Sequence, residues 1–128
     1  DAQESRGLGD VYKRQVLRGV SYGWHNLWPR FYNKQSVKWL KKDWKCTVLR
    51  AAIGTVIEDN YIENPEFALK CMNKVIKAAI KNDLYIIIDW HTYYPQKKEA
   101  KAFFSMLLIL SGTENSLKLH CANVMGFI

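Results

Sequence analysis

The sequence predicts an α/β fold with a parallel sheet, and three observations lead to that prediction. Segments of strand character alternate with segments of helical periodicity three times along residues 16–110. The connections between successive strands are long enough for parallel pairing. The run from Leu84 to Ile88 contains no polar residue, so it is apolar on both faces. A strand of that kind is typical of a parallel sheet that is covered on both sides.

The first unit begins with VLRGV at residues 16–20, which predicts a short strand; the Ser-Tyr-Gly that follows predicts a loop. Residues 35–45 then carry apolar side chains at Val37, Leu40 and Trp44, spaced three and four apart. This spacing predicts a helix whose inner face holds those three side chains.

The second unit contains the clearest local signals. Residues 46–54 predict a strand that stops at a glycine. After a loop, Asn64 is a suitable helix cap, Pro65 suits the first helical position, and Glu66 favours the positive end of the helix dipole. Apolar residues recur along one stripe of this helix, and Asn82 is a plausible stop.

The third unit is the strand LYIIIDWH at residues 84–91, followed by a helix that begins with KKEAKAFF. With a period of two, Asp89 and His91 share one face of this strand and Trp90 lies on the other. The order of three strand–helix units implies right-handed connections, and it leaves open both a doubly wound sheet and a (β/α)8 barrel. No glycine-rich nucleotide-binding loop follows any strand.

Charge and cysteine content exclude several classes of protein. The net charge is +7, but the lysines fall mainly on the polar faces of two predicted helices, so we expect solvated helix faces and no nucleic-acid partner. No apolar stretch reaches the ~18 residues that span a bilayer, so no membrane partner is expected. Three widely spaced cysteines indicate inert thiols. The sequence predicts no metal site and no cofactor.

Polar and aromatic side chains gather at the predicted carboxyl ends of the strands, where α/β folds place their sites. Arg50 lies in mid-strand and needs an anionic partner, either Asp89 or a later glutamate; a structural ion pair is the alternative. His91 has the chemistry to donate to or accept from a substrate hydroxyl, and a structural role stays open. The aromatic residues and the neighbouring histidine of this region are Trp24, His25, Trp28, Trp90, Tyr93 and Tyr94.

Flat aromatic rings at a cleft suit the apolar faces of sugars. We therefore expect Trp24, His25 and Tyr93 to bind a carbohydrate substrate. For Trp28 and Trp90, a place in an aromatic core is an equal alternative.

Three stretches, LRGVSYGWHN, KWLKKDWKCTVLRAA, and YIIIDWH with a following EAKAFF, resemble the first three βα units of glycoside hydrolase family 5, in particular bacterial endoglucanases of the cellulase type. The resemblance spans residues 16–105. It implies the N-terminal part of a (β/α)8 TIM barrel, three of eight units, from a retaining enzyme that hydrolyses O-glycosyl bonds of β-glucans in polysaccharide catabolism. Such a parent enzyme is expected to be secreted or periplasmic.

The resemblance also implies roles for single residues. Arg50 matches the arginine that orients the nucleophilic glutamate of the family, and His91 matches the histidine that contacts the sugar at the cleavage point. Trp24 and His25 fall, with a looser match, in the loop that lines the cleft. The family's acid/base glutamate stands in an Asn-Glu-Pro motif at the end of the fourth strand and its nucleophile on the seventh, and this sequence contains neither.

Retaining hydrolysis needs two carboxyl groups ~5 Å apart, so we expect this chain to be inactive. The alternative is a non-catalytic carbohydrate-binding remnant.

Residues 1–15 lack apolar periodicity and are expected to be a non-native junction. Residues 106–128 lose the earlier pattern, as a reading-frame change near Ser105 would cause, and no further strand is predicted there. A third strand without a partner on its far side is expected to favour self-association of the chain expressed alone.

Overall fold

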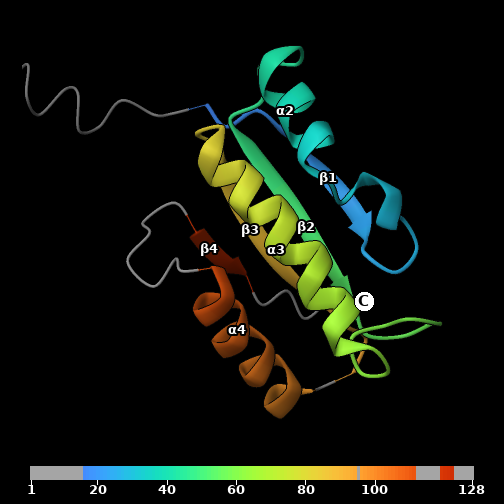
Figure 1. The fold of residues 1–128 in the computed structure, drawn as a ribbon. Coiled ribbons are helices and arrows are strands. Elements are labelled where there is room, and N and C mark those ends of the chain that lie inside the picture. The colour runs from blue at the N-terminus through green and yellow to red at the C-terminus, as the bar shows by residue number, and fades with distance from the viewer. Residues whose placement is uncertain (1–15, 95, 112–118, 123–128) are drawn as a thin grey trace, which may run out of the picture.

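The computed structural model describes residues 16–94, 96–111 and 119–122 of the 128-residue chain, and Figure 1 shows their arrangement. The proposed junction at residues 1–15 and most of the tail after Ser111 lie outside these ranges. In chain order the elements are β1 (Gly19–Trp24), the short 3-10 helix η1 (Pro29–Phe31), α2 (Lys34–Lys42), β2 (Val48–Gly54), α3 (Pro65–Lys81), β3 (Tyr85–His91), α4 (Lys97–Ser111) and β4 (Leu119–Ala122).

The strands form one sheet in the order β1-β2-β3-β4, and every neighbouring pair is parallel. The three helices α2, α3 and α4 lie side by side over the same face of this sheet (Figure 1). A doubly wound sheet carries helices on both faces, whereas a (β/α)8 barrel carries them only on its outside. Sequential strand order and one-sided helices therefore identify an incomplete α/β barrel, and the predicted fold class is confirmed.

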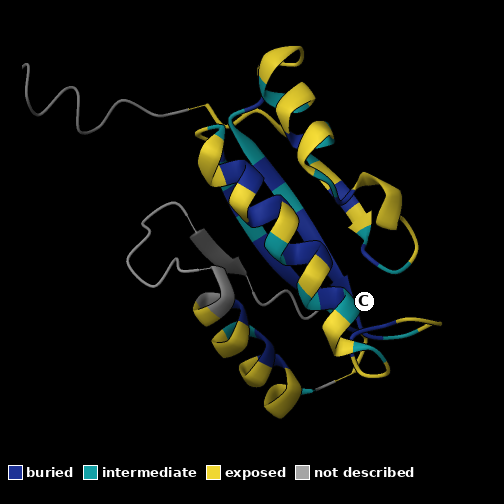
Figure 2. Ribbon diagram, viewed as in Figure 1, coloured by how far each residue is buried: buried dark blue, intermediate teal, exposed yellow. Residues whose placement is uncertain are grey.

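The core lies between the sheet and the helices, because alternate strand residues point toward them. Leu49 and Ile53 on β2, and Ile86, Ile88 and Trp90 on β3, are at most 1% exposed. Figure 2 shows the matching buried stripes on α3 and α4. The helical side of the core is supplied chiefly by Met72, Val75, Ile76, Phe103 and Leu107. The apolar period of the sequence thus assigns the two faces of the sheet correctly.

The ends of α3 follow the predicted chemistry. The Asn64 side chain accepts a hydrogen bond from the Phe67 backbone N–H at 3.3 Å, and Pro65 occupies the first turn. Asn82 caps the other end, where its side chain donates to the Ala78 carbonyl at 2.7 Å. Both caps satisfy backbone groups that the helix leaves unpaired.

Two predictions about the first unit are wrong. The first strand is Gly19–Trp24, not residues 16–20. Gly23 does not mark a loop; it lies inside the strand, where it leaves room for the Trp28 ring, because a Cβ there would come within 2.3 Å of Trp28 Cδ1. Trp44 does not belong to the inner face of a helix and is 72% exposed. The reason is that α2 ends at Lys42 and the chain turns through Lys45, whose φ is 55°.

The prediction that β3 lacks a partner on its far side is also wrong. The strand β4 pairs with it in parallel, with Ile86 opposite Leu119 and Asp89 opposite Ala122. The four residues of β4, LHCA, do not alternate apolar and polar side chains, so no period of two marks a strand there. The helix α4 continues to Ser111, beyond the point where its polar face ends. Among the described residues no helix is long and apolar enough to cross a membrane.

Candidate functional site

Polar side chains occupy the face of the sheet that the helices leave uncovered. The register places Ser21 of β1 beside Arg50 of β2, and Ala52 and Gly54 of β2 beside Asp89 and His91 of β3. Because the strands are parallel, their carboxyl ends meet at one edge, and alternate residues share the uncovered face. Residues far apart in the sequence are thereby gathered near the ends of three strands.

Arg50 and Asp89 form the centre of this group. Arg50 Nη2 donates to Asp89 Oδ2, and Arg50 Nη1 donates to Ser21 Oγ at 2.5 Å. The side chain of Asp89 is 0% exposed and that of Arg50 is 32% exposed. The predicted anionic partner of Arg50 is therefore Asp89 on the adjacent strand. An arginine left open on one side and fixed on the other keeps donors available to a further group.

His91 joins the same network from the end of β3. Its Nδ1 lies 2.9 Å from Asp89 Oδ2 and 3.4 Å from Arg50 Nη2. Its side chain is 29% exposed, so the imidazole is held by the carboxylate at Nδ1 and is only partly covered elsewhere. Thr55, at the end of β2, donates to the His91 backbone carbonyl at 3.3 Å, which links the ends of β2 and β3.

Two aromatic side chains complete the group. The rings of Trp24 and His91 are 5.2 Å apart, and those of Trp24 and Tyr93 are 5.9 Å apart. His91 and Tyr93 meet nearly at right angles, with ring centres 6.1 Å apart. The strand-end cluster, by which we mean Trp24, Arg50, Asp89, His91 and Tyr93, thus combines aromatic surface with charged and hydrogen-bonding groups.

His25 lies apart from the strand-end cluster. It is 0% exposed, its Nδ1 accepts a hydrogen bond from the Gly54 backbone N–H at 3.2 Å, and its ring packs on Phe67 at 5.8 Å. Burial lowers the pKa of His25 to about 4, against the opposing influence of Asp59. A neutral histidine in this place ties the loop after β1 to the end of β2.

The other candidates take different places. Trp90 is 1% exposed and packs edge-on against Tyr61 at 5.0 Å, so it is an aromatic core residue. Trp28 is 47% exposed and belongs to neither the core nor the strand-end cluster. Ser21 was not among the candidates, although its position opposite Arg50 brings it into contact. Only the register of β1 against β2 reveals it.

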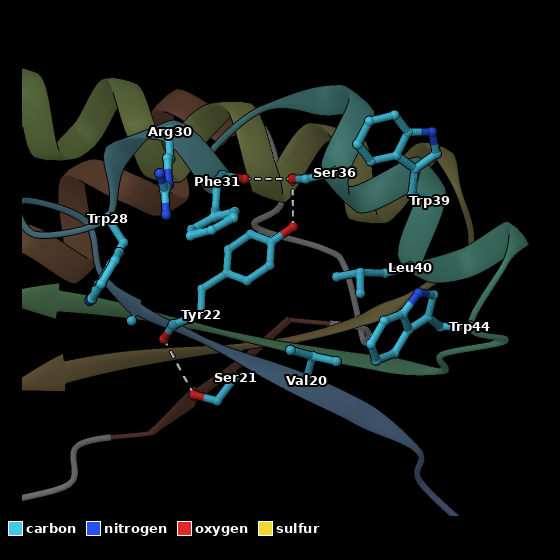
Figure 3. A pocket seen from close by; sticks show the side chains of 11 residues that line it. Val20, Ser21, Tyr22, Trp28, Arg30, Phe31, Ser36, Trp39, Leu40 and Trp44 are labelled. Carbon is cyan, nitrogen blue, oxygen red and sulfur yellow. Dashed lines mark hydrogen bonds between the residues drawn. The ribbon is translucent and has the colours of Figure 1, made fainter.

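A second hollow, a groove of about 510 Å³, lies between β1, η1 and α2. Figure 3 shows Tyr22 at its centre, with Trp39, Leu40 and Trp44 toward one end and Trp28, Arg30 and Phe31 toward the other. The Tyr22 hydroxyl is paired with Ser36 Oγ at 2.6 Å, and the Arg30 guanidinium rests over the Phe31 ring at 4.8 Å. We call this hollow the β1–α2 groove; it is aromatic but offers few free polar groups.

The chemistry available in the strand-end cluster is that of binding and orientation. Asp89 is the cluster's one carboxylate, and it is buried and paired with Arg50 and His91, so it is poorly placed to attack a substrate. The described residues include no group of three or more metal-ligating side chains. His91 and Arg50 present hydrogen-bonding groups, and Trp24 and Tyr93 present flat apolar faces, the combination that suits a sugar ring.

Comparison with known proteins gives a consistent result. The family model for cellulase (glycosyl hydrolase family 5) matches residues 10–110. Endoglucanase N of Pectobacterium atrosepticum is 38% identical over 126 residues, which is 94% of this chain and 28% of that protein. Endoglucanase 5 of Pectobacterium carotovorum is 37% identical over the same share of this chain and 25% of its own. The chain therefore spans about a quarter of the length of these curated relatives.

Solved structures agree with the sequence relatives. A structure from Cytophaga hutchinsonii has a TM-score of 0.75 at 37% identity and covers 86% of this chain and 36% of its own. The catalytic domain of an endoglucanase from Thermobifida fusca, solved in complex with cellotetraose, has a TM-score of 0.70 at 27% identity and covers 82% of this chain and 35% of that domain.

Proposed function

The chain belongs to the cellulase family, glycosyl hydrolase family 5, and from this premise we propose that the strand-end cluster is part of a β-glucan-binding cleft. The full-length protein would be a retaining, endo-β-1,4-glucanase-like enzyme that hydrolyses O-glycosyl bonds in polysaccharide catabolism. The observation that carries the proposal is the meeting of Trp24, His91 and Tyr93 around the Arg50–Asp89 pair. Ring faces and oriented donors at strand ends are what sugar recognition in a barrel requires.

Within this proposal each residue has a distinct task. His91 contacts a sugar hydroxyl, while Trp24 and Tyr93 supply ring faces. Arg50, fixed by Asp89 and Ser21, directs its remaining donors at the family's nucleophilic carboxylate. His25 is buried, so we assign it to holding the loop that carries Trp24, one step removed from the substrate.

The 128-residue chain by itself is proposed to be catalytically inactive. Its sequence has no Asn-Glu-Pro motif, and the one carboxylate of the strand-end cluster is committed to Arg50 and His91. Retaining hydrolysis needs one carboxyl group to attack and another to donate a proton. A carbohydrate-binding remnant is the second candidate function for the isolated chain, and the same cluster supports it.

The test is an NMR titration of the 128-residue chain with cellotetraose, together with an assay for released reducing ends. We expect the backbone amide of His91 to shift with sugar and no reducing ends to appear. Trp24→Ala should weaken binding about tenfold, equal to about 1.4 kcal/mol. Trp44→Ala, which removes an exposed tryptophan from the β1–α2 groove, is the matched control and should bind as the unchanged chain does.

Two outcomes would contradict these proposals. If both tryptophan variants bind equally, the strand-end cluster is not the sugar site. Release of reducing ends by the chain, lost in His91→Ala, would overturn the proposed inactivity.

We further propose that the isolated chain self-associates. Among the described strands, β1 pairs only with β2, so its other edge carries unpaired backbone groups. The β1–α2 groove beside this edge exposes Trp28, Trp39 and Trp44. An exposed strand edge next to an apolar surface is a template for association.

A further inference from the structure

The imidazole of His91 is held on one side by two charged groups. Its Nδ1 lies 2.9 Å from Asp89 Oδ2 and 3.4 Å from Arg50 Nη2. Arginine has only donors, and a carboxylate has only acceptors. Nδ1 therefore faces one group to which it could donate a proton and one from which it could accept.

The shorter contact decides between these two arrangements. If Nδ1 carried no proton, its lone pair would face a carboxylate oxygen at 2.9 Å, which is repulsive. The hydrogen bond that it would then accept from Arg50, at 3.4 Å, is too long to offset that repulsion. If Nδ1 is protonated, it makes a charge-assisted hydrogen bond of ordinary length to a carboxylate that is fixed by Arg50. The distances therefore assign the proton of neutral His91 to Nδ1.

We propose that Asp89 is a positioning residue that fixes His91 as the Nδ1–H tautomer, so that Nε2 serves as a hydrogen-bond acceptor for a donating hydroxyl of the ligand. The hydrogen bonds of His91 to the other described side chains run through Nδ1 and none through Nε2, Nε2 is not among the buried unpaired atoms, and the side chain as a whole is 29% exposed. The identity of the ligand as a sugar rests on the proposed function; the tautomer does not. Asp89 thereby acts on the ligand through His91 without touching it.

His25 provides a contrast within the same chain. The Gly54 backbone N–H donates to His25 Nδ1 at 3.2 Å, so that nitrogen carries a lone pair and the proton of neutral His25 is on Nε2. The two histidines, at the ends of β1 and β3, thus hold opposite tautomers. One is set by a backbone donor and the other by a carboxylate acceptor.

The experiment is a long-range ¹H–¹⁵N correlation spectrum of the histidine rings in the ¹⁵N-labelled chain, without sugar and at a pH where both rings are neutral. We expect the protonated-type nitrogen shift at Nδ1 for His91 and at Nε2 for His25. A protonated-type shift at Nε2 of His91 would overturn the proposal. Because no ligand is present, this result is independent of whether the chain binds sugar.

A variant then tests the role of Asp89 itself. In Asp89→Asn the acceptor of the Nδ1 proton is weakened and an amide donor is added, so the His91 nitrogens should move toward averaged or reversed shifts. The His25 pattern should stay unchanged, which reports that the strand ends remain folded. An unchanged His91 tautomer in a folded variant would show that Asp89 does not position it.

Adding cellotetraose to the unchanged chain distinguishes the role of Asp89 in fixing the tautomer from the contact of a sugar with Nε2. A shift at His91 Nε2 with Nδ1 nearly still supports the ligand contact at Nε2. The expected tautomer with no response to sugar would uphold the role of Asp89 and overturn the assignment of the ligand.

Discussion

The strand-end cluster and the β1–α2 groove are both rich in aromatic side chains, yet they differ in their polar groups. All the polar side chains that are buried in the described structure lie at or just beyond the carboxyl ends of β1, β2 and β3; they are His25, Thr55, Asn60, Asp89 and Thr92. The groove contains no buried charged side chain, and the hydroxyl of its Tyr22 is already paired with Ser36.

This difference teaches that aromatic density alone does not identify a sugar site. An apolar hollow supplies contact area but cannot orient a ligand, because orientation comes from a few placed hydrogen-bonding groups. Burying such groups is costly unless each finds a partner. A network such as Ser21–Arg50–Asp89–His91 is therefore stronger evidence of a site than an apolar hollow such as the groove.

The largest expected effect is on the free energy of unfolding, when an arginine is removed from each of the two regions in turn. Arg50→Ala leaves the fully buried Asp89 without its cation, and removing one partner of such a pair typically costs about 3–5 kcal/mol. Arg30→Ala in the groove removes only a guanidinium resting on Trp28 and Phe31, worth about 0.5–1 kcal/mol at an exposed site. Urea denaturation of both variants measures the difference.

Arg50→Lys sharpens this comparison. A lysine keeps the charge but loses the forked geometry that reaches both Ser21 and Asp89, so its loss of stability should fall between those of the unchanged chain and Arg50→Ala. Equal losses for Arg50→Ala and Arg30→Ala would mean that the strand-end cluster is no more constrained than the groove.

Much of the strand-end cluster could be predicted from sequence because its members obey short-range rules. Asp89 and His91 follow an apolar strand with a period of two, and a mid-strand Arg50 demands an anion. Both rules depend only on chain-local pattern and on the cost of burying charge. The same period places Trp90 on the opposite face, where the structure buries it.

The remaining features depend on contacts between distant segments. Ser21 reaches Arg50 only because of the register of β1 on β2, which itself shifts between Ser21 and Trp24. Trp44 fits the helical spacing of its neighbours, but the turn at Lys45 places it outside the helix. The pairing of β4 with β3 joins four residues whose sequence carries no strand period. Register, helix ends and short strands are tertiary effects that a local pattern does not contain.

The next largest expected effect is a pH dependence of the stability that comes from His25, which is buried just after β1. The pKa of His25 is about 4 in the folded chain and about 6.5 when exposed. Between these values the unfolded chain binds the extra proton, so stability is fully present above pH 6.5 and falls as the pH drops toward 4. The slope contributed by one such group approaches about 1.4 kcal/mol per pH unit near pH 5.

His25→Asn is the control for that slope. The Asn side-chain oxygen can still accept from the Gly54 N–H, but it does not titrate, so the contribution of His25 to the pH dependence should vanish. Urea denaturation at pH 4.5, 5.5 and 7 measures it for both chains. A variant as sensitive to acid as the unchanged chain would show that groups other than His25 govern acid stability.

The smallest expected effect belongs to the groove and concerns association rather than folding. Trp44 is 72% exposed at the edge of the β1–α2 groove, so Trp44→Ala should change the free energy of unfolding by less than about 0.5 kcal/mol. If copies of the chain meet through the groove, the same change should weaken dimerisation about tenfold, or about 1.4 kcal/mol. Sedimentation equilibrium across a concentration series measures this dimerisation constant.

Ile109→Ala is the control. It removes another exposed apolar side chain, 65% exposed on α4, and should leave the dimerisation constant within about twofold, as expected for a scattered surface residue. Similar losses in both variants would mean that association follows general apolar exposure, and the groove would then differ from the rest of the surface only in shape.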